Sequence, residues 1–312
     1  MPGAHPGGMT QLRILLLTAV APVAWGTTYL ITTELLPGGH PLLAALLRSL
    51  PAGLLALVIG KALPRGSWLW RSAVLGTLNI GAFFALLFVA AERLPGGVAA
   101  AVAGVQPLII IGIGCVVLRE RTPMPATAAG VAGAVGVALV VIGPSAQLDM
   151  IGVSAALGGI AATASGVVLT KRWGRPAGIG PIAYAGWQLT AGGLVLLPLT
   201  LLLEPIPAQV DLGAIAGYVW LGTVGGLLAY VLWFRGIQQL PVAAPGMLAL
   251  LSPVVATVLG VVVAGETFTL TQSAGIAIVL VALVSGQAFA LRRDGARSGS
   301  PAPRAEEPAR TR

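Results

Sequence analysis

One charged side chain stands inside an apolar run, where charge is costly. Arg48 lies about seven residues into the run 41–61, roughly 10 Å deep in a helix rising 1.5 Å per residue. An arginine at that depth in a bilayer costs about 2.5–3.5 kcal/mol unless it is paired or hydrated. Arg48 is therefore a candidate anchor for a substrate carboxylate, or a gate ion pair with Glu34 or Glu266. An arginine that snorkels to the outer headgroups explains it equally well.

Three amide side chains also lie deep in apolar runs: Asn79, Gln106 and Gln188. An amide in lipid needs a partner, so each is expected to face other helices. Gln106 directly precedes Pro107, where a bend would free carbonyl groups, and it is the favoured substrate contact. For Asn79 and Gln188, hydrogen bonds between helices are the favoured alternative.

Two aromatic pairs have helical spacing. Trp25 and Tyr29 are four residues apart, and Tyr230 and Trp233 are three apart, so each pair shares a face. Such a pair could stack on a flat or apolar substrate, or hold an ammonium group by cation–π contact. Trp233 lies near a predicted inner helix end, which favours a membrane-interface role. The same role is expected for the tryptophans that flank helix ends: Trp68, Trp70, Trp173 and Trp220.

The acidic residues lie at the ends of apolar runs, not in their middles. Glu34, Glu120 and Glu266 are candidates for gating or ion coupling, and the alternative is a water-facing helix cap. Because proton relays usually use a carboxylate near mid-membrane, a facilitator, an antiporter and coupling through outer acids all stay open.

Familiar enzymatic motifs are missing. The single Cys115 and the distant His5 and His40 make no metal cluster, and the sequence has no Walker A loop, HExxH motif or nucleophile elbow. We therefore expect no enzyme activity, no cofactor and no bound metal. The net charge of +8 does not indicate nucleic acid, because no basic groove with interleaved aromatics appears.

The elements that carry these residues are membrane helices. The chain of 312 residues is 56% hydrophobic and 9% charged, against roughly 25% charge in soluble domains. Ten apolar runs are each long enough to span a bilayer: 14–34, 41–61, 71–91, 96–118, 127–144, 152–172, 180–202, 212–236, 242–264 and 271–291. Cleavage of the first run as a signal peptide is the less favoured alternative, because it stays apolar through Ile31.

Charge indicates how the helices are oriented. With a cytoplasmic N-terminus, 16 of the 18 Lys and Arg residues fall on the inner side, Arg93 on the outer side and Arg48 within a helix. The positive-inside rule thus predicts cytoplasmic N- and C-termini in the cell's inner, or plasma, membrane. Residues 1–12 and 292–312 are polar and are expected to be disordered.

The sequence also predicts an internal repeat. Leu94–Glu120 aligns without a gap to Leu240–Glu266 at an offset of 146 residues, with eight matches. Each copy has a central proline, Pro107 or Pro253, that predicts a helix break. Two five-helix halves, 13–146 and 147–291, must enter the membrane from opposite faces, which makes an inverted repeat typical of alternating-access carriers.

These features resemble the drug/metabolite transporter superfamily, EamA type. The resemblance is carried by the ten helices in two repeats, by Trp25-Gly26, by Arg48, and by the LP…P…E block ending helices 4 and 9. It covers about residues 13–291. The second half departs from the first, since Trp25-Gly26 maps near Ser165-Gly166 and Arg48 near Gln188, so the site is expected to be asymmetric.

The resemblance implies transport of small metabolites such as amino acids. It also implies a central cavity lined by helices 1, 3, 4, 6, 8 and 9, with helices 5 and 10 peripheral. We predict a secondary transporter that moves an amphipathic metabolite outward. The partners expected are that substrate and the lipid bilayer, and a homodimer stays open. The alternative function is a membrane scaffold without transport or catalytic activity.

Overall fold

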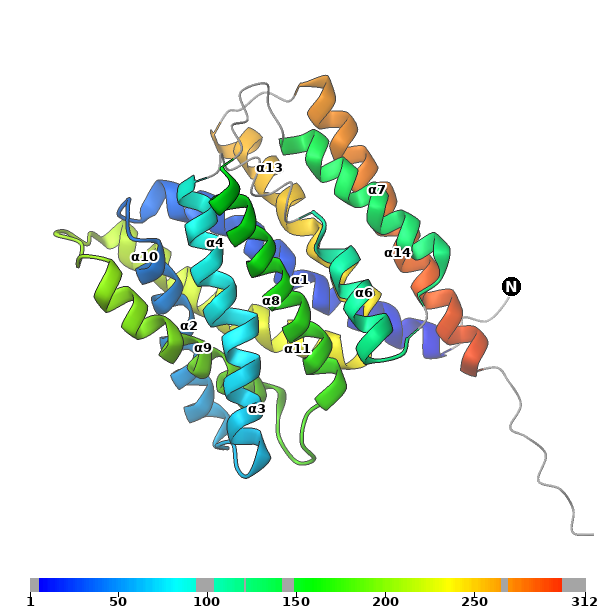
Figure 1. The fold of residues 1–312 in the computed structure, drawn as a ribbon, viewed down its shortest axis with the longest axis horizontal. Coiled ribbons are helices and arrows are strands. Elements are labelled where there is room, and N and C mark those ends of the chain that lie inside the picture. Colours follow the sequence, from blue (N-terminus) through cyan, green and yellow to red (C-terminus); the bar gives the residue numbers. More distant parts are fainter. Residues whose placement is uncertain (1–5, 94–103, 121, 142–148, 265–268, 299–312) are drawn as a thin grey trace, which may run out of the picture.

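The computed structural model describes residues 6–93, 104–120, 122–141, 149–264 and 269–298. Within these ranges every regular element is a helix (Figure 1). Six helices are long and apolar enough to cross a membrane, and four shorter apolar helices accompany them. Five of these ten spans precede residue 142 and five follow residue 149, so the fold is a ten-helix membrane protein with two five-helix repeats.

The first repeat contains the helices that carry Arg48 and Asn79. Its five spans are α1 (Pro6–Leu35), α2 (Pro41–Gly60), the composite α3 (Ser67–Gly76), η1 (Thr77–Gly81) and α4 (Ala82–Arg93), then α6 (Gln106–Val117) and α7 (Met124–Val141). The second repeat has the same composite third span. Its elements are α8 (Met150–Trp173), α9 (Pro181–Leu203), α10 (Leu212–Trp220), η2 (Leu221–Leu228), α11 (Ala229–Gln239), α12 (Ala243–Ala249), α13 (Leu251–Ala264) and α14 (Leu270–Ser298).

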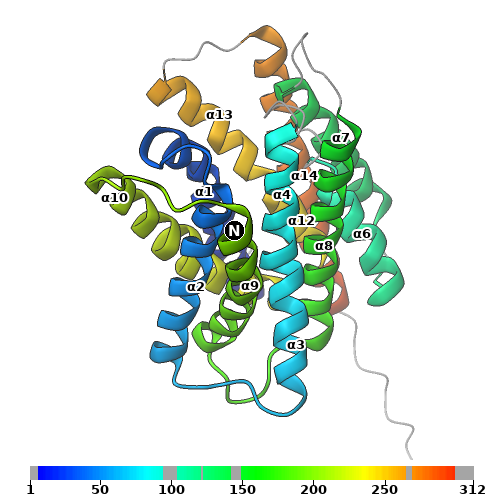
Figure 2. The same ribbon diagram turned by 60° about the vertical axis from the view of Figure 1, so that its left-hand side comes forward.

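The packing follows a pseudo-two-fold axis between the repeats. Second spans pack on each other as α2 and α9, and fifth spans as α7 and α14. Elsewhere the first span of one repeat packs on the third and fourth spans of the other: α1 on α11 and α13, and α8 on α4 and α6. Figures 1 and 2 both show α4 and α8 side by side. With five helices per repeat, this arrangement is an inverted repeat.

Two glycines permit the close contact on this axis. A Cβ on Gly53 of α2 would lie 2.5 Å from the backbone N of Thr190, and one on Gly193 of α9 would lie 2.7 Å from Leu50 Cβ. Gly53 and Gly193 occupy equivalent positions, as do Leu50 and Thr190, at an offset of 140 residues. Each glycine therefore removes the side chain that would separate the two helices.

Both third spans contain a π-helical segment at the same place. Shifted by 146 residues, η1 becomes 223–227 and falls inside η2. A π-helix replaces i→i+4 bonds by i→i+5 bonds and leaves carbonyl groups off the regular ladder, often at functional sites. The composition of the two spans does not reveal these π-helical segments, so the sequence does not predict them.

Glu204 fixes the start of the helix that carries Arg48. Its Oε1 accepts from the backbone N of Leu42 at 2.6 Å, and its Oε2 accepts from Leu43 N at 2.8 Å. These amides are among the unpaired donors at the N-terminus of α2. The carboxylate satisfies them and is favoured by the helix dipole.

Some helix limits differ from the expected ones. The first helix begins at Pro6, within the segment 1–12 expected to be disordered, and α14 continues to Ser298 beyond the expected limit at residue 291. Proline suits a first helical turn, and a formed helix extends at little cost through Ala and Arg. Pro107 lies in the first turn of α6, and Pro253 is the third residue of α13, just after the interruption at Leu250.

Candidate functional site

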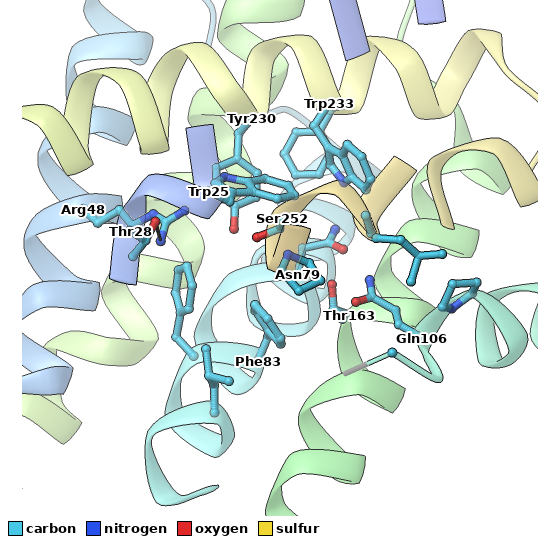
Figure 3. A pocket seen from close by; sticks show the side chains of 18 residues that line it. Trp25, Thr28, Arg48, Asn79, Phe83, Gln106, Thr163, Tyr230, Trp233 and Ser252 are labelled. Carbon is cyan, nitrogen blue, oxygen red and sulfur yellow. Dashed lines mark hydrogen bonds between the residues drawn. The ribbon is translucent and has the colours of Figure 1, made fainter. Parts of the chain in front are cut away.

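A cavity of about 240 Å³ lies at the centre of the bundle, where both repeats meet (Figure 3). Spans 1, 3, 4, 6, 8 and 9 line it, as the resemblance implies, and α2 contributes Arg48. The pair α7 and α14 contributes no lining residue and lies at one side of the bundle (Figure 1).

Arg48 lies in the cavity wall with its charge only partly compensated. The side chain is 7% exposed. Its Nη1 donates to Thr28 Oγ1 at 3.4 Å and its Nη2 to Gly225 O at 3.2 Å, while its Nε is buried without a partner. No carboxylate among the described residues lies within 4 Å, so the Arg48–Glu34 ion pair is not formed. Each Nη carries two N–H groups and has one acceptor here, so N–H groups remain that an anion in the cavity could use, whereas Nε has no exposed surface.

The π-helix η2 supplies the carbonyl that orients this end of the cavity. Gly225 O accepts from Arg48 Nη2 and also from Trp25 Nε1, at 3.0 Å. Figure 3 shows Trp25 next to Arg48 and Thr28. The backbone irregularity in span 8 thus holds both an arginine from span 2 and a tryptophan from span 1.

Aromatic rings form much of the wall. The ring centroid of Trp25 lies 5.2 Å from that of Tyr230 and 5.1 Å from that of Trp233, and the Cζ of Arg48 lies 5.2 Å from the Phe84 centroid. The interface role expected for Trp233 is wrong, because this residue is 3% exposed and lines the cavity. Its place near a helix end misled the prediction, since α11 is packed between α1, α8 and α9.

The three amides divide into two kinds. Asn79 Nδ2 donates to Gln188 Oε1 at 2.8 Å and to Thr170 Oγ1 at 3.3 Å, which links spans 3, 6 and 7. Gln188 is fully buried and does not line the cavity, whereas Asn79 does. Gln106 lines the cavity at the end opposite Arg48 and makes no hydrogen bond with the described residues (Figure 3).

Arg48 and Gln188 occupy related positions in the inverted repeats, as do Gly225 and Asn79. Arg48 of α2 reaches Gly225 of η2, and Gln188 of α9 bonds Asn79 of η1. Asn79 and Gly225 correspond at the offset of 146, and Arg48 and Gln188 at 140. The same structural position therefore holds a cation in one half and a neutral amide pair in the other, as the expected asymmetry requires.

Among the acidic candidates, Glu120 bridges the repeats. Its Oε2 accepts from Val242 N at 3.3 Å, and its Oε1 lies 3.8 Å from Lys171 Nζ. Lys171 Nζ also donates to Leu240 O. Glu34 is exposed at the end of α1. Glu266 lies outside the described residues, and the side chain of Tyr29 is not described.

The four remaining tryptophans behave differently from one another. Trp70 and Trp220 are 52% and 41% exposed, as membrane-facing residues would be. Trp68 is partly covered and contacts the rings of Tyr184 and Trp187, while Trp173 stands edge-on to Trp70 at 5.2 Å.

Several lining residues had no sequence signal. Most of the apolar runs contain a threonine, a serine or a phenylalanine, so only the fold distinguishes the lining ones: Thr28, Phe83, Phe84, Thr163, Phe234 and Ser252. Within the described part of the chain, no group of three His, Cys, Asp or Glu side chains could hold a metal.

Comparison with known proteins identifies the family. The model of the EamA-like transporter family matches residues 12–142 and again residues 150–285. The chain belongs to the EamA-like transporter family. It is therefore an integral membrane transporter of the drug/metabolite superfamily, and its two matches correspond to the two repeats of the fold.

Individual relatives agree with this assignment. Protein PecM of Dickeya dadantii (strain 3937) is 46% identical over 271 residues, which cover 87% of this chain and 91% of PecM. The uncharacterized transporter YwfM of Bacillus subtilis is 26% identical over 280 residues, covering 86% and 92%. The uncharacterized inner membrane transporter YedA of Escherichia coli K12 is 25% identical over 269 residues, covering 84% and 86%.

A solved crystal structure shares the fold. It superposes with a TM-score of 0.77 at 21% sequence identity, over 90% of this chain and 99% of that one. At this identity the likeness supports the helical architecture alone.

Proposed function

We propose that this EamA-family member exports a small amphipathic carboxylate, an amino acid or a related compound, by alternating access. The observation that carries the proposal is the buried Arg48 guanidinium in the wall of the central cavity, with no carboxylate of the described residues beside it. A substrate carboxylate would take up its unused hydrogen-bonding capacity in a water-poor site, where charge-assisted bonds are strong.

The remaining walls favour an apolar portion on the substrate. Trp25, Tyr230 and Trp233 offer ring faces within one cluster, and Phe83 and Phe84 add further apolar surface. Rings of this kind can stack on an apolar group or contact an ammonium group. Gln106, at the far end, supplies an amide for a second polar group. A cavity of about 240 Å³ suits a substrate of metabolite size.

Alternating access requires contacts that form and break on one side of the cavity. The Glu120–Lys171 ion pair and the Glu120–Val242 hydrogen bond join α6 of the first repeat to α8 and the start of α12 in the second. We propose that this cluster closes the cytoplasmic side and opens when the cavity faces inward. Glu34 and Glu266 remain candidates for the corresponding outer contacts.

The orientation is part of the same proposal. We propose that both chain ends lie in the cytoplasm and that the protein lies in the inner membrane. Support comes from the distribution of Lys and Arg, from the start of α1 and the end of α14 lying at one end of the bundle (Figure 1), and from the inner-membrane relative YedA.

Flux through reconstituted protein tests the function. Purified protein in liposomes is given a panel of labelled amino acids, other carboxylates and uncharged analogues of the same shape. The expected result is saturable flux of at least one carboxylate and weaker flux of its amide analogue. Intact folded protein that moves none of them would favour a scaffold. The direction of transport is measured in cells. If the protein exports its substrate, deletion of the protein should raise the concentration of the substrate inside the cell.

A further inference from the structure

A second arginine, away from the cavity, is surrounded by tryptophan. The Cζ of Arg71, in α3, lies 5.4 Å from the ring centroid of Trp68, 5.5 Å from that of Trp70 and 5.6 Å from that of Trp173. Trp173 ends α8, so the cluster joins the first turns of α3 to the end of α8. Trp70 and Trp173 are themselves in edge-on contact at 5.2 Å.

The rings fix this guanidinium without neutralising it. Cation–π contact attracts the cation but supplies no acceptor for its N–H groups. No carboxylate of the described residues lies within 4 Å of Arg71, and its Nε is buried without a partner. Because Nε is buried, the edge that can meet a ligand is the one formed by Nη1 and Nη2, and two parallel hydrogen bonds from this edge suit a phosphate.

The surroundings place this arginine at a lipid-facing, basic end of the molecule. Trp70 is 52% exposed and Leu69 is 60% exposed, as expected for side chains that meet lipid near the interface. The sequence has no acidic residue between Glu34 and Glu92 or between Asp149 and Glu204, and basic residues lie on the α2–α3 connection, at the end of α8 and on the α8–α9 connection: Lys61, Arg65, Arg172 and Arg175. The Glu120 carboxylate also reaches this end, but it is paired with Lys171. Local charge therefore favours an anion.

We propose that Arg71, with Trp70 and Trp173, forms a binding site for the headgroup phosphate of an anionic phospholipid. The phosphate pairs with the Arg71 guanidinium, and the exposed indole of Trp70 lies among the glycerol and upper acyl region, beside the partly buried Trp173. The neighbouring basic residues select a lipid with net negative charge. The leaflet is the one at the α2–α3 and α8–α9 connections, which the orientation proposed above makes cytoplasmic.

Thermal unfolding of detergent-purified protein tests the site. Phosphatidylglycerol is expected to raise Tm by about 2 °C or more, in the range that a free-energy change of about 1 kcal/mol produces in a chain of this size. Phosphatidylcholine and inorganic phosphate should each raise it by much less. Arg71→Gln should remove the phosphatidylglycerol increment. The matched control Arg65→Gln, on the exposed α2–α3 connection, removes one of several neighbouring charges but leaves the Arg71 guanidinium, so it should keep most of the increment.

Two further measurements protect the test against simple misfolding. Arg71→Lys keeps the charge and most of the packing but loses the planar fork, so it should fold and show a reduced increment. Quenching of tryptophan fluorescence by brominated phosphatidylglycerol should weaken clearly more in Arg71→Lys than in Arg65→Gln. A full increment in Arg71→Gln, or equal increments from phosphatidylcholine or free phosphate, would overturn the site. Neither result bears on substrate flux, so the transport proposal stands or fails separately.

Discussion

At the scale of single residues, chemistry in this protein depends on which buried polar groups are satisfied. Glu204 and Asn79 have partners in neighbouring helices, whereas Arg48 has one unpaired buried nitrogen and faces a cavity. A buried group with all its bonds made stabilises a fold, and one with unused capacity is available to a ligand. Substitutions should therefore separate into those that change stability and those that change transport.

Arg48→Gln, which introduces the residue found at the related position of the other repeat, should impair transport of a carboxylated substrate. A hydrogen bond to a charged group contributes about 1.5–3 kcal/mol, so kcat/KM should fall by roughly tenfold to a hundredfold. Flux of an uncharged analogue should change far less. Arg48→Lys should recover part of the loss. The anion-anchor proposal fails if Arg48→Gln transports the carboxylate as well as the control Arg65→Gln does.

The amides should show the opposite separation. Gln188→Leu removes the shorter of the two hydrogen bonds that the buried Asn79 amide donates and leaves the one to Thr170. It also deletes an Nε2 that is buried without a partner. A lost hydrogen bond costs about 0.5–1.5 kcal/mol, so Tm should fall by a few degrees. Gln106→Leu leaves no described hydrogen bond broken, so it should raise the KM for substrate with little change in Tm. Measuring Tm and KM for both variants shows which amide stabilises the fold and which contacts the substrate. A stability loss in Gln106→Leu with unchanged KM would reverse it.

At the scale of helices, close approach between the repeats depends on glycine. Gly53→Ala places a Cβ at 2.5 Å from Thr190 N, closer than atoms tolerate, so α2 and α9 must separate. Overpacking of this kind costs typically about 1–3 kcal/mol. Gly112→Ala is the matched control, because nothing lies within 4 Å of its added methyl and alanine favours helix by about 0.5–1 kcal/mol. Thermal unfolding should show a lower Tm for the first and an equal or higher Tm for the second.

The proposed cytoplasmic gate can be tested by exchanging its charges. Glu120→Lys alone leaves two ammonium groups facing each other and removes the acceptor for Val242 N, so the closed inner side should be destabilised and flux altered. The double variant Glu120→Lys/Lys171→Glu restores opposite charges, and flux should recover at least in part. Because the pair is partly exposed, its own contribution to stability is small, about 0–1 kcal/mol. A double variant no better than the single one would show that the pairing is not what matters.

At the scale of the whole molecule, the sequence predicted what hydrophobic length and charge alone determine. The ten spans follow from those patterns, and the two repeats follow from the aligned blocks Leu94–Glu120 and Leu240–Glu266. The choice of cavity-lining helices came from the family resemblance, and the sequence left Arg48 open between a cavity anchor and a snorkelling side chain. What it missed depends on backbone register and packing. No composition signals that η1 and η2 shift their hydrogen bonds, or that Gly225 O becomes a shared acceptor. Trp233 was misplaced because a residue near a helix end is buried when three other helices cover that end.

The inverted repeat makes a final prediction about the two sides of the membrane. An odd number of spans separates the α2–α3 connection from the α9–α10 connection, so these must lie on opposite faces. Single cysteines placed in a Cys115→Ala background test this directly. Ser67→Cys and Gln209→Cys both stand at exposed positions. With cytoplasmic termini, a membrane-impermeant maleimide should label Gln209→Cys in intact cells and Ser67→Cys only after permeabilisation. Equal labelling of both cysteines from outside would contradict the inverted arrangement. Labelling of Ser67→Cys alone in intact cells would keep the inversion but reverse the orientation of the protein in the membrane. The proposed gate and the lipid site would then lie on the outer side.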